Sequence, residues 1–152
     1  MHHYRTAIIQ LPLVKDTPTV AVKTPAQVAE ICSDMVDLAQ EVFQVLVLSS
    51  KNKLITRCMV SIGLLDASLV HPREVFRQAI IEHGAAIALC HNHPSGDSTA
   101  SAEDIRITKQ LIECGNILDI KILDHVIIGK KTETQPGFLS MRESGLCDFS
   151  GK

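Results

Sequence analysis

The 152-residue sequence has no tryptophan, one tyrosine and four phenylalanines, so aromatic residues make up only 3% of it. It therefore has few of the side chains on which proteins stack nucleic-acid bases. Fifteen basic and 17 acidic residues give a formal net charge of -2, which provides no general attraction for a polyanion. The composition argues against a dedicated DNA-binding module and predicts an aliphatic core.

Long apolar runs are also absent. The apolar runs over residues 45–48 and 85–90 have the length of core strands, whereas a membrane span needs about 18 residues or more. The N-terminus, including His2 and His3, lacks the basic-then-apolar layout of a signal peptide. The odd number of cysteines and the lack of a Cys-x-x-Cys motif predict reduced thiols. We therefore expect a cytoplasmic protein that does not enter a membrane.

The length is typical of one globular domain. We place this domain at residues 24–145, with a lead-in over residues 1–23 and a tail over residues 146–152. Helical and strand-like patterns alternate along the domain, and no internal repeat is visible. This order predicts an α/β (α+β) fold with a single mixed β-sheet flanked by helices.

The first half of the domain shows one helix and a pair of strands. Thr24 and Pro25 predict a helix start, because threonine is a good N-cap and proline is tolerated in the first turn. Apolar residues at helical spacing extend the predicted helix to about residue 40. The strands Val42–Leu48 and Leu54–Ile62 follow as a hairpin, and the continuous aliphatic run of the first indicates burial on both faces.

The second half alternates in the same way. His71 and Pro72 open a helix that we expect Gly84 to close. A buried strand over residues 85–90 then runs directly into His91. Further along we expect a helix over residues 102–114 that stops at Gly115, a strand over residues 120–128 and a short strand over residues 138–139.

The most informative stretch begins at this strand end, with His91-Asn92-His93. In an extended segment, residues two apart point the same way with Cα atoms about 6.6 Å apart. Two imidazoles in this arrangement can bind one ion, at Zn–N distances of about 2.0–2.1 Å, while Asn92 points to the opposite side. A His-x-His pair by itself is also common as a surface or hydrogen-bonded pair, so the spacing alone favours a metal site only modestly.

A third ligand is expected from a carboxylate beyond the turn at Gly96. Ser101 is placed as the N-cap of the next helix, and Asp104 then lies in its first turn, where the helix dipole keeps a carboxylate ionised. The same two residues also fit an ordinary capping box. Of the candidates Asp97, Glu103 and Asp104, we choose Asp104, because Asp97 beside a glycine is more simply a turn residue. Two histidines and one carboxylate leave a coordination position for water, which is typical of catalytic zinc.

This pattern resembles the JAMM (MPN/JAB) metalloprotease motif, in which His-x-His is followed after seven residues by Ser and after two more by Asp. Within that superfamily the chain is most similar to the RadC-like branch. The resemblance implies the JAB/MPN, cytidine-deaminase-like architecture. Full-length RadC proteins also carry a helix-hairpin-helix region. We do not expect this chain to make the DNA contacts of that region. The segments that carry the resemblance, in order, are residues 71–76, 91–97, 123–125 and 140–145.

The resemblance also implies a role for each matched residue. His91, His93 and Asp104 would bind Zn²⁺, and Ser101 would hydrogen-bond the oxyanion or the nucleophilic water. The residue that matches the general base of the family is Glu41, which we expect to end the first helix and lead into the buried strand. Its rivals among the glutamates are Glu30, Glu74 and Glu82.

The implied function is that of a zinc-dependent hydrolase that cleaves peptide or isopeptide bonds in a peptide or protein substrate. The alternative is a non-enzymatic binding protein associated with DNA repair or mobile elements, with a structural or vestigial zinc site. The charge and the few aromatic residues do not favour DNA as a partner. An inactive scaffold in a larger complex is a third alternative, which the intact ligand set disfavours.

Two further features have structural interpretations. Asp124 and His125 lie in an otherwise apolar strand, where a hydrogen-bonded core pair, or a pair that supports the ligands, is favoured over further metal ligands. The sheet edges and the loop over residues 63–70 are candidates for substrate docking or dimerisation.

Overall fold

The computed structural model describes residues 20–63 and 70–151. The first 19 residues, with His2 and His3, lie outside the described residues, as does most of the loop proposed for docking. None of the helices in the described ranges has the length and apolar character needed to cross a membrane. All five cysteines lie in these ranges and are free thiols, as expected.

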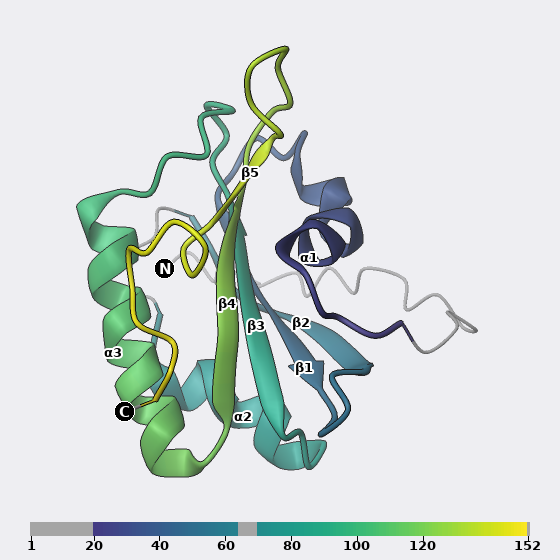
Figure 1. The fold of residues 1–152 in the computed structure, drawn as a ribbon, viewed down its shortest axis with the longest axis vertical. Helices are drawn as coiled ribbons and strands as arrows, with labels where there is room; N and C mark the ends of the chain where they lie inside the picture. The colour runs from purple at the N-terminus through teal and green to yellow at the C-terminus, as the bar shows by residue number, and fades with distance from the viewer. Residues whose placement is uncertain (1–19, 64–69, 152) are drawn as a thin grey trace, which may run out of the picture.

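Five strands form one mixed sheet in the order β2-β1-β3-β4-β5 (Figure 1). The antiparallel hairpin of β1 (Val42–Leu48) and β2 (Leu54–Ile62) has the predicted bounds, and β1 is buried at every position. β1 also pairs antiparallel with β3 (Ala86–Asn92), which in turn pairs in parallel with β4 (Lys121–Ile128). The short β5 (Phe138–Ser140) closes the order, and the predicted fold class is confirmed.

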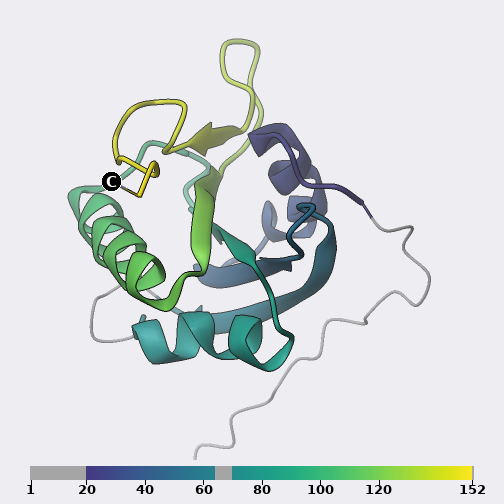
Figure 2. The ribbon, with the colours of Figure 1, turned by 60° about the horizontal axis from the view of Figure 1, so that its bottom comes forward.

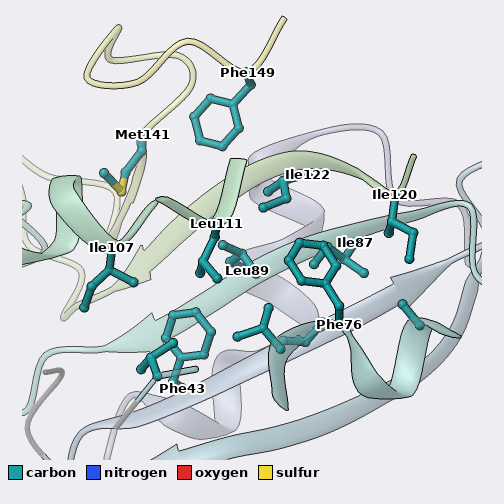
Figure 3. Packing of buried hydrophobic residues seen from close by; sticks show 14 of the residues in the cluster. Phe43, Phe76, Ile87, Leu89, Ile107, Leu111, Ile120, Ile122, Met141 and Phe149 are labelled. Carbon is teal, nitrogen blue, oxygen red and sulfur yellow. The ribbon is translucent and has the colours of Figure 1, made fainter. Parts of the chain in front are cut away.

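Helices cover both faces of the sheet (Figures 1 and 2). α1 (Pro25–Ile31) and the 3-10 helix η1 (Ser33–Met35) pack on one face. α2 (Pro72–Ile81) and α3 (Ala102–Leu118) pack on the other. Figure 3 shows the second of these layers, which is mostly aliphatic apart from a few phenylalanines.

The crossover from β3 through α3 to β4 positions the site. Because β3 and β4 are parallel, the helix between them must run back along the sheet, and its first turn lies at the end of β3. The loop that joins β3 to α3 lies at the upper left of Figure 1. The candidate site residues of β3 and α3 therefore meet where β3 ends.

The first helix is much shorter than predicted. Thr24 caps it as expected, in a capping box with Gln27, but α1 ends at Ile31 instead of near residue 40. The Ile31 carbonyl accepts a hydrogen bond of 2.9 Å from the Arg57 guanidinium, which also pairs with Asp34 at 2.8 Å. These contacts hold the end of α1 against β2, and the chain continues only as the short η1. Glu41 therefore enters β1 from a loop and not from a helix end.

Two glycines were predicted to end helices, and both predictions were wrong. The left-handed residue after α2 is His83, with φ 53°, and a Cβ at Gly84 would lie 2.5 Å from Val47 Cγ1. α3 continues through Gly115 and ends at Leu118, followed by the left-handed Asp119. Both glycines are required by close packing instead of by a positive φ.

Candidate metal centre

Four of the five predicted site residues converge at the end of β3. Glu41, His91, His93 and Asp104 each offer a ligand atom, and these atoms all lie within 4.8 Å of one another. They come from the loop before β1, from β3 and its end, and from the first turn of α3. The fifth, Ser101, is the N-cap of α3 and is hydrogen-bonded to Asp104.

The two histidines face each other as the strand pattern predicted. His91 lies within β3 and is fully buried, and its Nε2 is 3.0 Å from His93 Nε2. His93 follows β3, and its Nδ1 is 2.8 Å from the carbonyl oxygen of Asp97. A carbonyl can only accept, so His93 Nδ1 carries the proton and donates, and Nε2 is the atom left to bind an ion.

Asp104 is both a capping residue and a neighbour of both imidazoles. Its Oδ2 accepts from Ser101 N at 2.8 Å, and Ser101 Oγ accepts from Asp104 N at 3.0 Å. The same carboxylate lies 3.2 Å from His91 Nε2 and 3.3 Å from His93 Nε2. The ordinary capping box and the ligand role therefore do not exclude each other.

The electrostatics of the cluster favour an ionised carboxylate. Burial alone would raise the pKa of Asp104, but its interactions with the imidazoles of His91 and His93 hold that pKa well below its usual range. The nearby Asp104 carboxylate favours the protonated ring and so raises the pKa of His93 against the opposing effect of burial. An ionised Asp104 carboxylate is the form that a metal ligand requires.

Glu41 stands further back than the other three. Its Oε1 lies 3.7 Å from His91 Nε2 and 3.8 Å from His93 Nε2, and its side chain is 13% exposed. The rival glutamates Glu30, Glu74 and Glu82 are not in the cluster.

Asn92 holds the segment that carries Glu41. It points away from the two histidines, as predicted, and it is 1% exposed. Its Oδ1 accepts from Val42 N at 2.8 Å, and its Nδ2 donates to the Gln40 carbonyl at 3.0 Å. The residues on either side of Glu41 are therefore fixed by the residue between the two imidazoles. Sequence analysis missed this role, although the position of an asparagine in a buried strand end was a signal for it.

The two imidazole nitrogens and the Asp104 carboxylate have the spacing that a small divalent cation needs. Two bonds of about 2.0–2.1 Å that meet at the tetrahedral angle hold their ligand atoms about 3.3–3.4 Å apart. The observed separations are 3.0 Å between His91 Nε2 and His93 Nε2, 3.2 Å from His91 Nε2 to Asp104 Oδ1, and 3.3 Å from His93 Nε2 to Asp104 Oδ2. Two imidazoles and a carboxylate are also a donor set that zinc accepts.

The other carboxylates considered from the sequence have different partners. Asp97 accepts from Thr99 N at 2.9 Å and from Thr99 Oγ1 at 2.7 Å, which is the turn role expected of it. Glu103 pairs with Arg106 on the surface of α3. Neither belongs to the cluster.

Asp124 and His125 are both buried, but they serve different parts of the molecule. Asp124 accepts from Ser140 Oγ at 2.5 Å and from Arg142 N at 3.0 Å, and burial raises the pKa of its carboxyl group. His125 contacts the site: its Nε2 is 2.7 Å from His91 Nδ1. Burial lowers the pKa of His125 well below the usual value. Sequence reasoning treated the two residues as one pair, whereas they point to opposite faces of β4.

The fold and the site together define an α/β domain with a two-histidine, aspartate and glutamate group that can hold a metal ion. A family model described as the RadC-like JAB domain matches residues 22–146. The chain belongs to this family, as the resemblance implied. Membership of this family supports a JAMM-like fold for this chain. The JAB/MPN class includes metalloproteases.

Curated relatives match over most of the chain. A UPF0758 protein of Caldanaerobacter subterraneus subsp. tengcongensis is 48% identical over 130 residues, which is 85% of this chain and 54% of the relative. One of Geobacillus thermodenitrificans is 50% identical over 115 residues, 76% of this chain and 49% of the relative. One of Clostridium botulinum is 46% identical over 125 residues, 82% of this chain and 53% of the relative. The chain thus spans about half the length of these relatives.

Proposed function

We propose that this chain is a zinc-dependent hydrolase of the JAMM type that cleaves peptide or isopeptide bonds. One observation carries the proposal. The two imidazole nitrogens lie 3.0 Å apart, and each lies 3.2–3.3 Å from one oxygen of the Asp104 carboxylate, whereas the Glu41 carboxylate stands 3.7–3.8 Å from the two imidazoles. This arrangement supports a set of three ligands with a general base beside it, as a catalytic metal site requires.

His91, His93 and Asp104 would hold the ion, which when bound polarises a carbonyl and lowers the pKa of a water molecule. Glu41 accepts a proton from the attacking water and returns it to the amine that leaves. Ser101 Oγ accepts from Asp104 N, so its own hydroxyl proton is free to be donated to the oxyanion of the tetrahedral intermediate. Ser101 is exposed, so a substrate can reach this hydroxyl.

The test separates metal binding from catalysis. Elemental analysis of purified protein should find one zinc per chain in the wild type and in Glu41→Gln, and a clear loss in His91→Ala. The two zinc-loaded proteins are then incubated with a library of peptides and isopeptide-linked peptides, and new amino termini are identified by mass spectrometry. Cleavage by the wild type and not by Glu41→Gln supports the proposal.

Two results would overturn it. The first is less than stoichiometric zinc that His91→Ala does not change. The second is cleavage that survives in Glu41→Gln. A salt-sensitive DNA affinity that persists without zinc would instead support the non-enzymatic alternative.

A further inference from the structure

A continuous line of buried polar contacts runs behind the two histidines and connects three elements. His91 Nδ1, on β3, is 2.7 Å from His125 Nε2, on β4. The other ring nitrogen of His125 is 2.6 Å from Thr108 Oγ1, on α3. Thr108 Oγ1 is in turn 2.6 Å from the carbonyl oxygen of Asp104. His91, Thr108 and His125 are all fully buried.

The chemistry of the last contact gives the whole line a direction. A carbonyl oxygen has no proton, so the hydroxyl of Thr108 must donate to Asp104 O. Having used its only proton, this hydroxyl can only accept from His125 Nδ1. His125 Nδ1 therefore carries a proton, and the neutral imidazole with this tautomer presents a lone pair at Nε2.

The same reasoning extends to His91. The unprotonated Nε2 of His125 can only accept, so His91 must carry a proton on Nδ1 and donate it. The Nε2 of His91 is then the unprotonated nitrogen, and it faces the other two proposed ligands, His93 and Asp104. Phe43 restrains both rings, stacking on His91 with 6.2 Å between centroids and meeting His125 edge-on at 5.5 Å.

We propose that Thr108 and His125 are positioning residues that hold the proton of His91 on Nδ1 and so reserve His91 Nε2 for the metal ion. This inference rests on the proposed metal site. A single contact, with the Asp97 carbonyl, holds the proton of His93 on Nδ1 in the same way. The line of contacts also ends on the backbone of Asp104, so the residue that supplies the carboxylate helps to set the tautomer of an imidazole ligand.

The decisive variant is Thr108→Val, which keeps the shape of the side chain but removes the hydroxyl. His125 Nδ1 then loses its acceptor, and the opposite tautomer, with the proton on Nε2, becomes competitive. Residues that orient a metal-bound histidine typically contribute about 10–100-fold to metal affinity. We expect Thr108→Val to weaken zinc binding by about 10-fold and His125→Phe to weaken it by up to about 100-fold.

Two control variants separate orientation from packing. Thr108→Ser keeps the hydroxyl and should keep the zinc affinity of the wild type. Ile107→Val, at a neighbouring core position that is 1% exposed, removes a methylene and should lower thermal stability without changing zinc affinity. Affinity is measured by competition with a chromophoric zinc chelator, at a temperature where every variant is folded.

A second readout needs no zinc. Long-range ¹H–¹⁵N spectra of the zinc-free protein identify the protonated nitrogen of each imidazole. We expect His125 to carry its proton on Nδ1 in the wild type and in Thr108→Ser, and a mixture of tautomers in Thr108→Val. His125 protonated on Nε2 in the wild type would overturn the proposal, as would a zinc affinity for Thr108→Val equal to that of Ile107→Val.

The two readouts distinguish the inference from the proposed function. If the protein shows the expected tautomer but binds no zinc, the result supports the positioning role of Thr108 and His125 on His91 and contradicts the proposed hydrolase. A chain that binds zinc equally in all variants keeps its metal site and loses this inference.

Discussion

Three consecutive residues show how much of the site depends on side-chain direction. His91 and His93 point into the candidate metal site from one side of the strand end. Asn92, between them, faces the other way and holds the backbone on either side of Glu41. The alternation of a strand thus places two ligands on one face and the support of the general base on the other. A shift of one residue in the register of β3 would exchange these roles.

Replacing Asn92 tests this arrangement. Asn92→Ala removes a buried acceptor and a buried donor and leaves Val42 N and the Gln40 carbonyl without these partners. We expect the free energy of unfolding to fall by about 1–3 kcal/mol, measured by urea denaturation. Zinc affinity should be retained, while hydrolysis falls because Glu41 is no longer fixed. Asn116→Ala, on the exposed side of α3, is the control.

Ser101 combines two roles that substitutions can separate. Alanine at an N-cap costs about 0.5–2 kcal/mol, whereas glycine costs only a few tenths. Ser101→Ala should therefore unfold more easily than Ser101→Gly in denaturant titrations, although both lack the hydroxyl. If the hydroxyl donates to the oxyanion, both variants lose hydrolysis to the same extent. Activity that instead follows stability would leave Ser101 with its capping role alone.

At the residue scale, the sequence identifies the groups that have a local pattern. The spacing of His91 and His93, and the capping position of Asp104, are properties of short segments. Glu41 has no such pattern, and only the resemblance to a family singled it out. Thr108 was missed, because its contact with His125 depends on how α3 packs against β4. Its position four residues after Asp104, on the same face of the helix, was the only local signal.

At the scale of elements, the sequence predicts where helices begin better than where they end. Thr24 and Ser101 cap their helices as expected, because a capping box is completed within four residues. The ends of α1 and α3 are set by other parts of the molecule. Arg57 of β2 binds the last carbonyl of α1, and Gly115 fits α3 against the start of β4.

Gly115 therefore gives a test in which propensity and packing oppose each other. In an exposed helix, alanine is about 1 kcal/mol more favourable than glycine. At this position a Cβ would lie 2.6 Å from Ile120 O and 3.3 Å from Phe76 Cζ. We expect Gly115→Ala to lower the melting temperature, as seen by circular dichroism. Gln110→Ala, on the exposed face of the same helix, should change it little, and stabilisation by Gly115→Ala would contradict this account of the packing.

At the scale of the whole molecule, the order of the elements was sufficient to predict one mixed sheet between helices. That prediction depends on alternation along the chain, which a sequence displays directly. The prediction of the sheet did not depend on where each element ends. The placement of Glu41 does depend on where the first helix ends, because the segment between η1 and β1 is a loop. This loop is fixed by Asn92 and by a hydrogen bond of 2.7 Å from Gly63 N to the Glu41 carbonyl.

The metal ion should act on the stability of the whole domain. Its proposed ligands lie on β3, at the end of β3 and on α3, so they come together only when the sheet and the helix are both folded. A ligand that binds only the folded state stabilises it by about 2.7 kcal/mol at a free concentration 100 times its dissociation constant. We expect zinc removal by a chelator to lower the melting temperature of the wild type in a single transition. His93→Ala should melt at one temperature with or without zinc, whereas His83→Asn, which changes a histidine outside the cluster, should respond like the wild type. An equal response to zinc in His93→Ala would place the ion elsewhere and remove the basis for a catalytic centre at the end of β3.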